Sequence, residues 1–138
     1  MVLPPWFWFA MLVLVMWGIV GILQKLSTNY ISAESSLIWL VVGFFLVLPW
    51  LYPGKVLFTY SPRSLTWALV SGFLNALGAW ALFAAMKSGG KASIVVPFTA
   101  LYPVVVAIAA PIFLHESLSL FQGVGVVCAL VAGFLLST

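Results

Sequence analysis

The ionisable side chains of this sequence are few, and they lie far apart along the chain. There is no aspartate, and the two glutamates, Glu34 and Glu116, fall with the single histidine, His115, at the ends of predicted helices. Hydrolysis, proton abstraction and metal-assisted catalysis each need several such groups held together in one site. The lone cysteine, Cys128, cannot form an intramolecular disulfide or a cysteine-based metal cluster. We therefore expect no enzymatic activity, no catalytic residue, no metal site and no cofactor.

Uncharged polar residues instead form stripes on predicted helices. Ser71 and Asn75 share one helical face. Asn75 is the one side-chain amide well inside an apolar segment, and an amide in hydrocarbon needs partners in protein or in a water-filled cavity. It can form an interhelical hydrogen bond or contact a substrate. Trp17 shares a face with Gln24 and Thr28, which suits either anchoring at the membrane interface or substrate contact.

The segment from residue 93 to residue 114 contains three prolines, Pro97, Pro103 and Pro111. Pro103 has no N–H to donate to the carbonyl of Thr99, so the sequence predicts a kink and a free carbonyl near the middle of this segment. Broken helices at the membrane midplane are where many transporters bind their solutes. Thr99 and Tyr102, on the same face as Pro103, are therefore candidate cavity contacts, with Pro97 as a further kink. A kink that serves packing alone is the alternative.

Small residues recur at intervals of four near the end of the chain. Gly125, Ala129 and Gly133 form a ridge that allows another helix to approach closely, within this chain or in a second one.

The overall composition indicates whether these elements fold in water or in lipid. Of the 138 residues, 65% are hydrophobic and only 5% are charged, too few to cover the surface of a water-soluble globule. The five basic residues are scattered, so nothing indicates nucleic-acid binding. The sequence predicts an all-α, multi-pass membrane protein whose immediate partner is the lipid bilayer. We expect that membrane to be the plasma membrane of a prokaryotic cell, its inner membrane.

Five apolar segments predict five transmembrane helices in a single domain over residues 1–138. Their approximate extents are residues 6–26, 37–52, 65–86, 93–114 and 120–136. Three short polar motifs predict helix starts: Ser32 before the second segment, Ser61 with Pro62 before the third, and Ser119 with Gln122 at the fifth. The polar stretch from Ser27 to Ser36 predicts a short loop, in which Ser32 could cap the second helix.

An odd number of spans places the two ends of the domain on opposite sides of the membrane. The side of the N-terminus then carries Lys55 and Arg63, and the other side carries Lys25, Lys87 and Lys91. Because positive charge in short loops orients membrane proteins, two charges against three give only a weak preference. The chain can insert either way, or it can take its orientation with the help of a partner.

From Ala81 onward the sequence resembles the EamA domain of the drug/metabolite transporter superfamily. The resemblance lies in the run Ala92 to Pro97, in Leu101-Tyr102-Pro103, in Glu116, and in Gln122 to Gly125. Trp17-Gly18 followed by Lys25 is similar to the opening segment of that family, whereas the second segment adds nothing. Ser117 is a departure, because the family often has a basic residue after the glutamate.

The resemblance implies a bundle in which five-span units pair as inverted repeats around a central cavity. Most members fuse two units, and this chain looks like the single, half-size form. Such a unit needs a partner, either as an antiparallel homodimer or as a complex with a related five-span chain. The nearly balanced loop charges fit dual insertion independently.

These observations lead to two expectations about function. The first is a transporter subunit that moves a small metabolite, such as an amino acid or a related compound, by alternating access in an antiparallel dimer. The alternative is a structural or accessory subunit of a membrane complex, which transports nothing and whose polar stripes are fully paired in protein.

Overall fold

The computed structural model describes residues 5–137, and every regular element in that range is a helix. The elements are α1 (Pro5–Tyr30), α2 (Ala33–Leu51), the 3-10 helix η1 (Gly54–Phe58), α3 (Pro62–Lys87), α4 (Ala92–Thr99), α5 (Tyr102–Phe113) and α6 (Leu120–Ser137). Four segments are long and apolar enough to cross a membrane: Phe7–Tyr30, Ala33–Leu51, Pro62–Lys87 and Ala92–Phe113. A shorter apolar helix, Leu120–Leu135, follows them. The prediction of an all-α membrane protein with about five spans is confirmed.

The chain divides after Gly89 into two compact units. The first unit contains α1, α2 and α3, and the second contains α4, α5 and α6. Gly89 has a backbone φ of 105°, a conformation that glycine adopts without the strain a Cβ would cause. This explains why the predicted turn between the third and fourth segments is rich in glycine.

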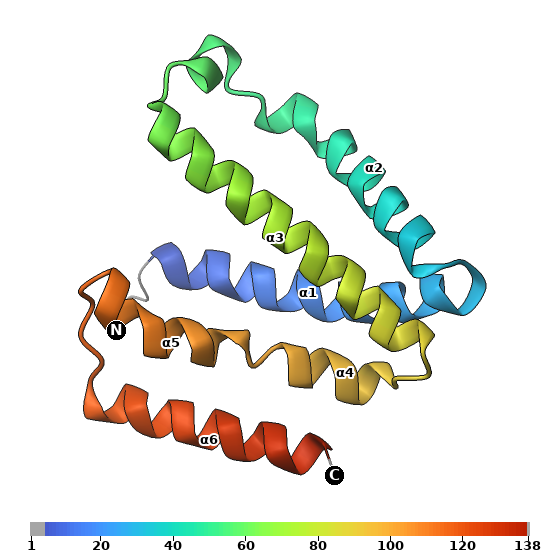
Figure 1. Ribbon diagram of the computed structural model, residues 1–138, viewed down its shortest axis with the longest axis vertical. Coiled ribbons are helices and arrows are strands. Elements are labelled where there is room, and N and C mark those ends of the chain that lie inside the picture. Colours follow the sequence, from blue (N-terminus) through green and yellow to red (C-terminus); the bar gives the residue numbers. More distant parts are fainter. Residues whose placement is uncertain (1–4, 138) are drawn as a thin grey trace. The chain divides into compact units, whose positions relative to one another are not determined.

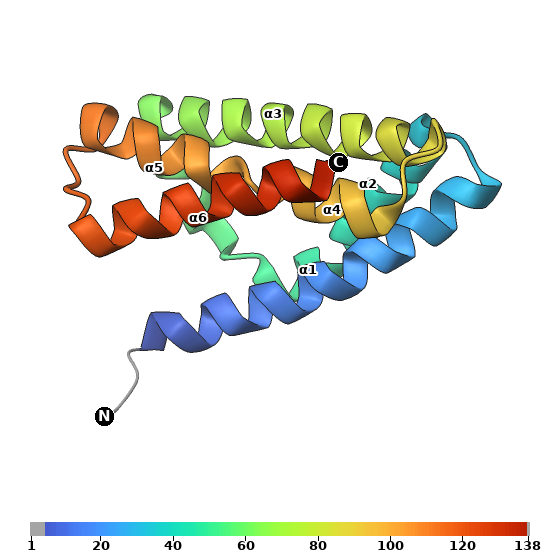
Figure 2. The same cartoon turned by 90° about the horizontal axis from the view of Figure 1, so that it is seen from below.

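In the first unit, α1, α2 and α3 come together near the turn between α1 and α2. Figure 1 shows that α2 and α3 lie close at this end and diverge toward η1. Figure 2 shows the same tendency for α1 and α3. The buried apolar residues of the unit lie here, with Ala33, Phe83 and Met86 each no more than 5% exposed. The remaining apolar surface is exposed, as expected for helices that face lipid.

The loop predicted after the first span is much shorter in the structure, so that prediction is wrong. Helix α1 continues through the polar residues and ends at Tyr30, so that only two residues separate it from α2. The Thr28 hydroxyl donates to the Lys25 carbonyl at 3.0 Å, and the hydroxyls of Ser27 and Ser36 lie 2.8 Å apart. Because α1 and α2 satisfy these hydroxyls between them, polar residues can stay helical where α1 and α2 pack.

The predicted helix starts in the first unit are confirmed. The Ser32 hydroxyl accepts from the Ser35 N–H at 3.2 Å and caps α2, with Glu34 in the first turn. The Ser61 hydroxyl accepts from the Ser64 N–H at 3.2 Å and caps α3, where proline occupies the first position. Both caps supply acceptors to N–H groups that have no partner inside the helix.

In the second unit, α6 runs antiparallel to the pair α4 and α5 and contacts both of them (Figure 1). The predicted capping box at its start is confirmed. The Gln122 side-chain oxygen accepts from the Ser119 N–H at 2.7 Å, and the Ser119 hydroxyl accepts from the Gln122 N–H at 3.3 Å.

Candidate functional site

The fourth predicted span is a broken helix. It runs from Ala92 to Phe113, and α4 ends at Thr99 while α5 begins at Tyr102. Tyr102 and Pro103 therefore lie at the centre of this span, where the sequence predicts a kink. The other two prolines, Pro97 and Pro111, lie inside α4 and α5 without ending them. A break at this depth places backbone polar groups in the apolar part of the membrane.

The hydroxyl of Thr99 is used locally. It donates to the Val95 carbonyl at 2.9 Å and lies 3.1 Å from the Val96 carbonyl. The residue is exposed, as are Ala100 and Tyr102, whereas Leu101 is half-buried. The hydroxyl oxygen keeps its acceptor lone pairs, but its proton is engaged with the backbone of α4.

Leu101, at the break, packs against Gly133 of α6. Gly133 is buried, and a Cβ at this position would overlap the δ1 methyl of Leu101 and lie 3.2 Å from its Cγ. Glycine is therefore the one residue that fits here without moving Leu101. Of the other members of the predicted ridge, Ala129 is half-buried, and nothing lies within 4 Å of a Cβ placed at Gly125.

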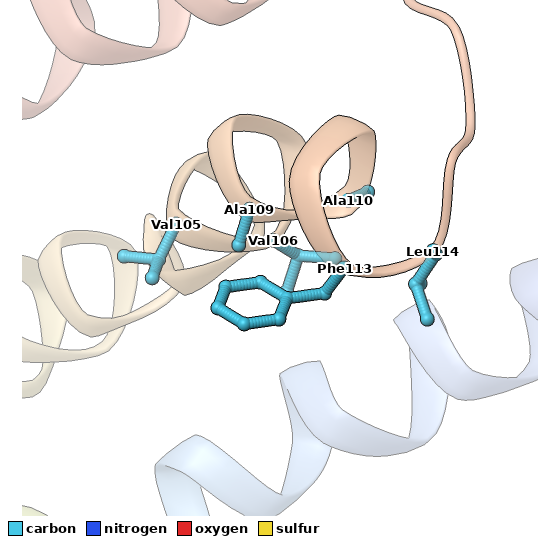
Figure 3. A pocket seen from close by; sticks show the side chains of 6 residues that line it. All are labelled: Val105, Val106, Ala109, Ala110, Phe113 and Leu114. Carbon is cyan, nitrogen blue, oxygen red and sulfur yellow. The ribbon is translucent and has the colours of Figure 1, made fainter.

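A shallow hollow of about 290 Å³ lies along α5 and the residue after it (Figure 3). Its lining is wholly apolar: Val105, Val106, Ala109, Ala110, Phe113 and Leu114. None of the predicted cavity residues contributes to it. With no polar group to orient a solute, the hollow suits a hydrocarbon chain or an apolar side chain.

The predicted cavity residues of the first unit lie on exposed helix faces. Ser71 and Asn75 are both exposed on one face of α3, and Trp17 of α1 is 56% exposed. Within residues 5–137 the Asn75 amide makes no hydrogen bond. Thr99 and Tyr102 belong to the second unit, at the break between α4 and α5, whereas Ser71, Asn75 and Trp17 belong to the first.

Two polar contacts of the first unit are not predicted by the sequence. The Lys25 ammonium donates to the carbonyl of Met86 at 2.8 Å, which links α1 to the last turn of α3. The Trp80 indole N–H donates to a carboxylate oxygen of Glu34 at 3.3 Å, which links α3 to the first turn of α2. The partners are distant in sequence, and no local pattern identifies them.

The described residues contain no group of three or more histidine, cysteine or acidic side chains that could hold a metal ion. The candidate site residues offer the hydroxyls of Ser71, Thr99 and Tyr102, the Asn75 amide and the Trp17 indole N–H. Such atoms can bind and orient a solute.

Comparison with known proteins identifies relatives over almost the whole chain. Residues 4–138 match the model of the EamA-like transporter family. An uncharacterized protein of Methanocaldococcus jannaschii is 31% identical over 128 residues, which cover 93% of each chain. No solved structure matches the chain.

Proposed function

The chain belongs to the EamA-like transporter family, whose members are membrane transporters of the drug/metabolite type rather than enzymes, and from this premise we propose a specific mechanism. The protein moves a small metabolite, such as an amino acid or a related compound, by alternating access. It does so as an antiparallel homodimer, or paired with a related five-span chain, in the plasma membrane of a prokaryotic cell.

The observation that carries this proposal is the break between α4 and α5. A lipid-facing helix keeps its backbone hydrogen bonds, because each unsatisfied group costs several kcal/mol in hydrocarbon. A broken helix is stable there only where protein or a water-filled cavity covers it. Thr99 and Ala100 are exposed within this chain, so a partner or a cavity must cover the break, and we propose a cavity at the middle of the membrane.

The dimer is supported by the number of spans and by loop charge. About five helices form half of an inverted-repeat bundle, and a two-fold axis in the membrane plane completes it with a second copy. Two basic residues on one side of the domain and three on the other leave its orientation weakly fixed. Both orientations of one chain can then meet in one membrane.

The residues proposed to contact the solute are Asn75 and Ser71 on α3, Trp17 on α1, and Thr99 and Tyr102 at the break. Asn75 is an exposed amide in the middle of a long, mostly apolar helix, so a solute or water in a cavity would supply the partners it needs. Pro103 keeps the break open, and the ridge from Gly125 to Gly133 provides the close packing of α6.

The proposal can be tested without knowing the solute. Proteoliposomes containing the purified chain are loaded with a small-molecule extract of cells, and the compounds released are identified by mass spectrometry. We expect release of a narrow set of metabolites. Pro103→Ala should slow this release about tenfold, because a continuous helix closes the break, whereas Pro111→Ala lies away from the break and should have little effect.

Two results would count against this proposal. Release that does not exceed that of protein-free liposomes would favour the accessory-subunit alternative. Equal release by wild type and Pro103→Ala, with both inserted in equal amounts, would show that transport does not depend on the break.

A further inference from the structure

The connection between α2 and α3 leads into two basic side chains and contains no acidic one. Lys55 lies in η1 and Arg63 in the first turn of α3, at the ends where α2 and α3 diverge (Figure 1). Both side chains are exposed, and neither forms a hydrogen bond or an ion pair within the described residues. Glu116, which the span count places on the same side of the membrane, belongs to the second unit. Two cationic groups are therefore available to an anionic partner.

Aromatic and apolar side chains place this connection at the surface of the lipid. Tyr52 precedes η1 and Tyr60 follows it, and both are more than half exposed. Tyrosine is enriched at the level of the lipid headgroups. Val56 and Leu57 of η1 are apolar and exposed, directly after Lys55. Exposed apolar residues next to a basic residue are typical of a segment that lies in the membrane interface, so Lys55 lies at the depth of the headgroups.

The opposite side of the first unit has basic residues whose charge is offset. The Lys25 ammonium is bonded to the Met86 carbonyl, and Glu34 lies on the same side, in the first turn of α2. Lys87 is in the last turn of α3, where the negative end of the helix dipole offsets its charge. Arg63, in contrast, lies at the positive end of α3, so its charge and the dipole have the same sign. The stronger attraction for an anion is therefore at the connection between α2 and α3.

We propose that residues 52–63 bind the anionic headgroup of a membrane phospholipid such as phosphatidylglycerol, with Lys55 and Arg63 contacting its phosphate. These residues are not among the candidate cavity contacts, and the inference depends neither on transport nor on the dimer. Because the Ser64 N–H at the start of α3 is already bonded to Ser61, the two basic side chains are the donors. A phosphate ion alone would leave the apolar residues of η1 exposed to water, whereas a lipid covers them.

The test compares two lipids that differ in the charge of the headgroup. Phosphatidylglycerol and phosphatidylcholine with identical acyl chains are titrated into the purified full chain in detergent, and the bound lipids are counted by native mass spectrometry. We expect phosphatidylglycerol to bind about tenfold more tightly, because each basic residue near the membrane surface strengthens the binding of anionic lipid. A chain in detergent has no membrane sides, so its orientation in the cell does not affect the result.

The double variant Lys55→Gln/Arg63→Gln removes both charges and keeps polar side chains at both positions. It should weaken phosphatidylglycerol binding about tenfold and leave phosphatidylcholine binding unchanged. Lys87→Gln/Lys91→Gln is the matched control, because it removes the same net charge from the opposite side. The control should weaken phosphatidylglycerol binding by less than about threefold.

Three results would overturn the inference. The first is equal binding of the two lipids by the wild type, a comparison that stands even if the double variant fails to fold. The second is equal weakening by the two double variants, which would make net charge, rather than this surface, responsible. The third is displacement of phosphatidylglycerol by inorganic phosphate at matched ionic strength, which would assign the basic residues to a free anion.

Discussion

At the scale of the residue, a few contacts determine how closely helices approach in a chain that has little buried surface. Leu101 and Gly133 illustrate this, because a leucine at the break occupies the space that a side chain at Gly133 would need. Gly125, two turns earlier on α6, has open space around it. The same residue type on one predicted ridge therefore has two different environments, and a single substitution at each position distinguishes them.

Gly133→Ala should destabilise the protein by about 1–3 kcal/mol, because the new methyl overlaps the δ1 methyl of Leu101 and forces that side chain out of its position. Gly125→Ala is the matched control and should be neutral or stabilising by up to about 1 kcal/mol, since alanine favours the helix. Thermal unfolding of the purified variants in the same detergent measures both. Equal stability of the two variants would show that the contact with Leu101 is not tight.

Lys25 should contribute to stability through its bond to the Met86 carbonyl. Lys25→Met removes the ammonium donor but keeps an unbranched chain of similar length, and we expect a loss of about 1.5–3 kcal/mol. Lys91→Met, in the turn before α4, removes the same charge from an exposed position and should cost less than about 0.5 kcal/mol. Denaturant unfolding followed by circular dichroism makes the comparison, and equal losses would mean that charge, rather than the hydrogen bond, is responsible.

At the scale of the element, the start of each helix follows from local chemistry, and the contacts between helices do not. Ser32, Ser61 and Ser119 cap helices within three residues of their own positions, so their pattern is visible in the sequence. Glu34 and Trp80 are 46 residues apart, and Lys25 and Met86 are 61 apart. Such pairs depend on how α1, α2 and α3 approach one another in space, which helical periodicity does not specify.

The extent of α1 also depends on contacts between helices, which the local sequence does not specify. Polar residues from Ser27 to Asn29 predict a loop when they are considered one at a time. In the folded chain the hydroxyl of Ser27 meets that of Ser36, and Thr28 is buried, so the helix continues. The break before Pro103 was predicted because the missing N–H is a property of the residue itself, although Pro97 and Pro111 lie inside α4 and α5 without ending them. Packing can satisfy a hydroxyl, but it cannot replace that N–H.

The capping box of α6 provides a prediction for this scale. Gln122→Ala removes the side-chain oxygen that accepts from the Ser119 N–H and should cost about 0.5–1.5 kcal/mol. Gln122→Glu retains an acceptor at the same position and should preserve stability. Hydrogen exchange at the start of α6 should accelerate in the alanine variant alone. Unchanged exchange in Gln122→Ala would show that the cap does not hold this helix end.

At the scale of the whole molecule, the central claim is that two copies of this chain, in opposite orientations, enclose one pathway. The chain has about five spans and nearly equal basic charge on the two sides, so one sequence can supply both halves of an inverted repeat. The helices expose much apolar surface, and the Asn75 amide makes no hydrogen bond within residues 5–137. Both observations agree with a unit that a partner completes. The claim concerns orientation, so topology tests it directly.

The measurement that tests this claim most directly is the location of the C-terminus in intact cells, determined with a reporter that is active on one side of the membrane and a second reporter active on the other. We expect both reporters to be active in comparable amounts. Adding two lysines to the loop that carries Lys55 should then shift the population to a single orientation. A C-terminus found on one side only, in the unmodified chain, would contradict the antiparallel homodimer.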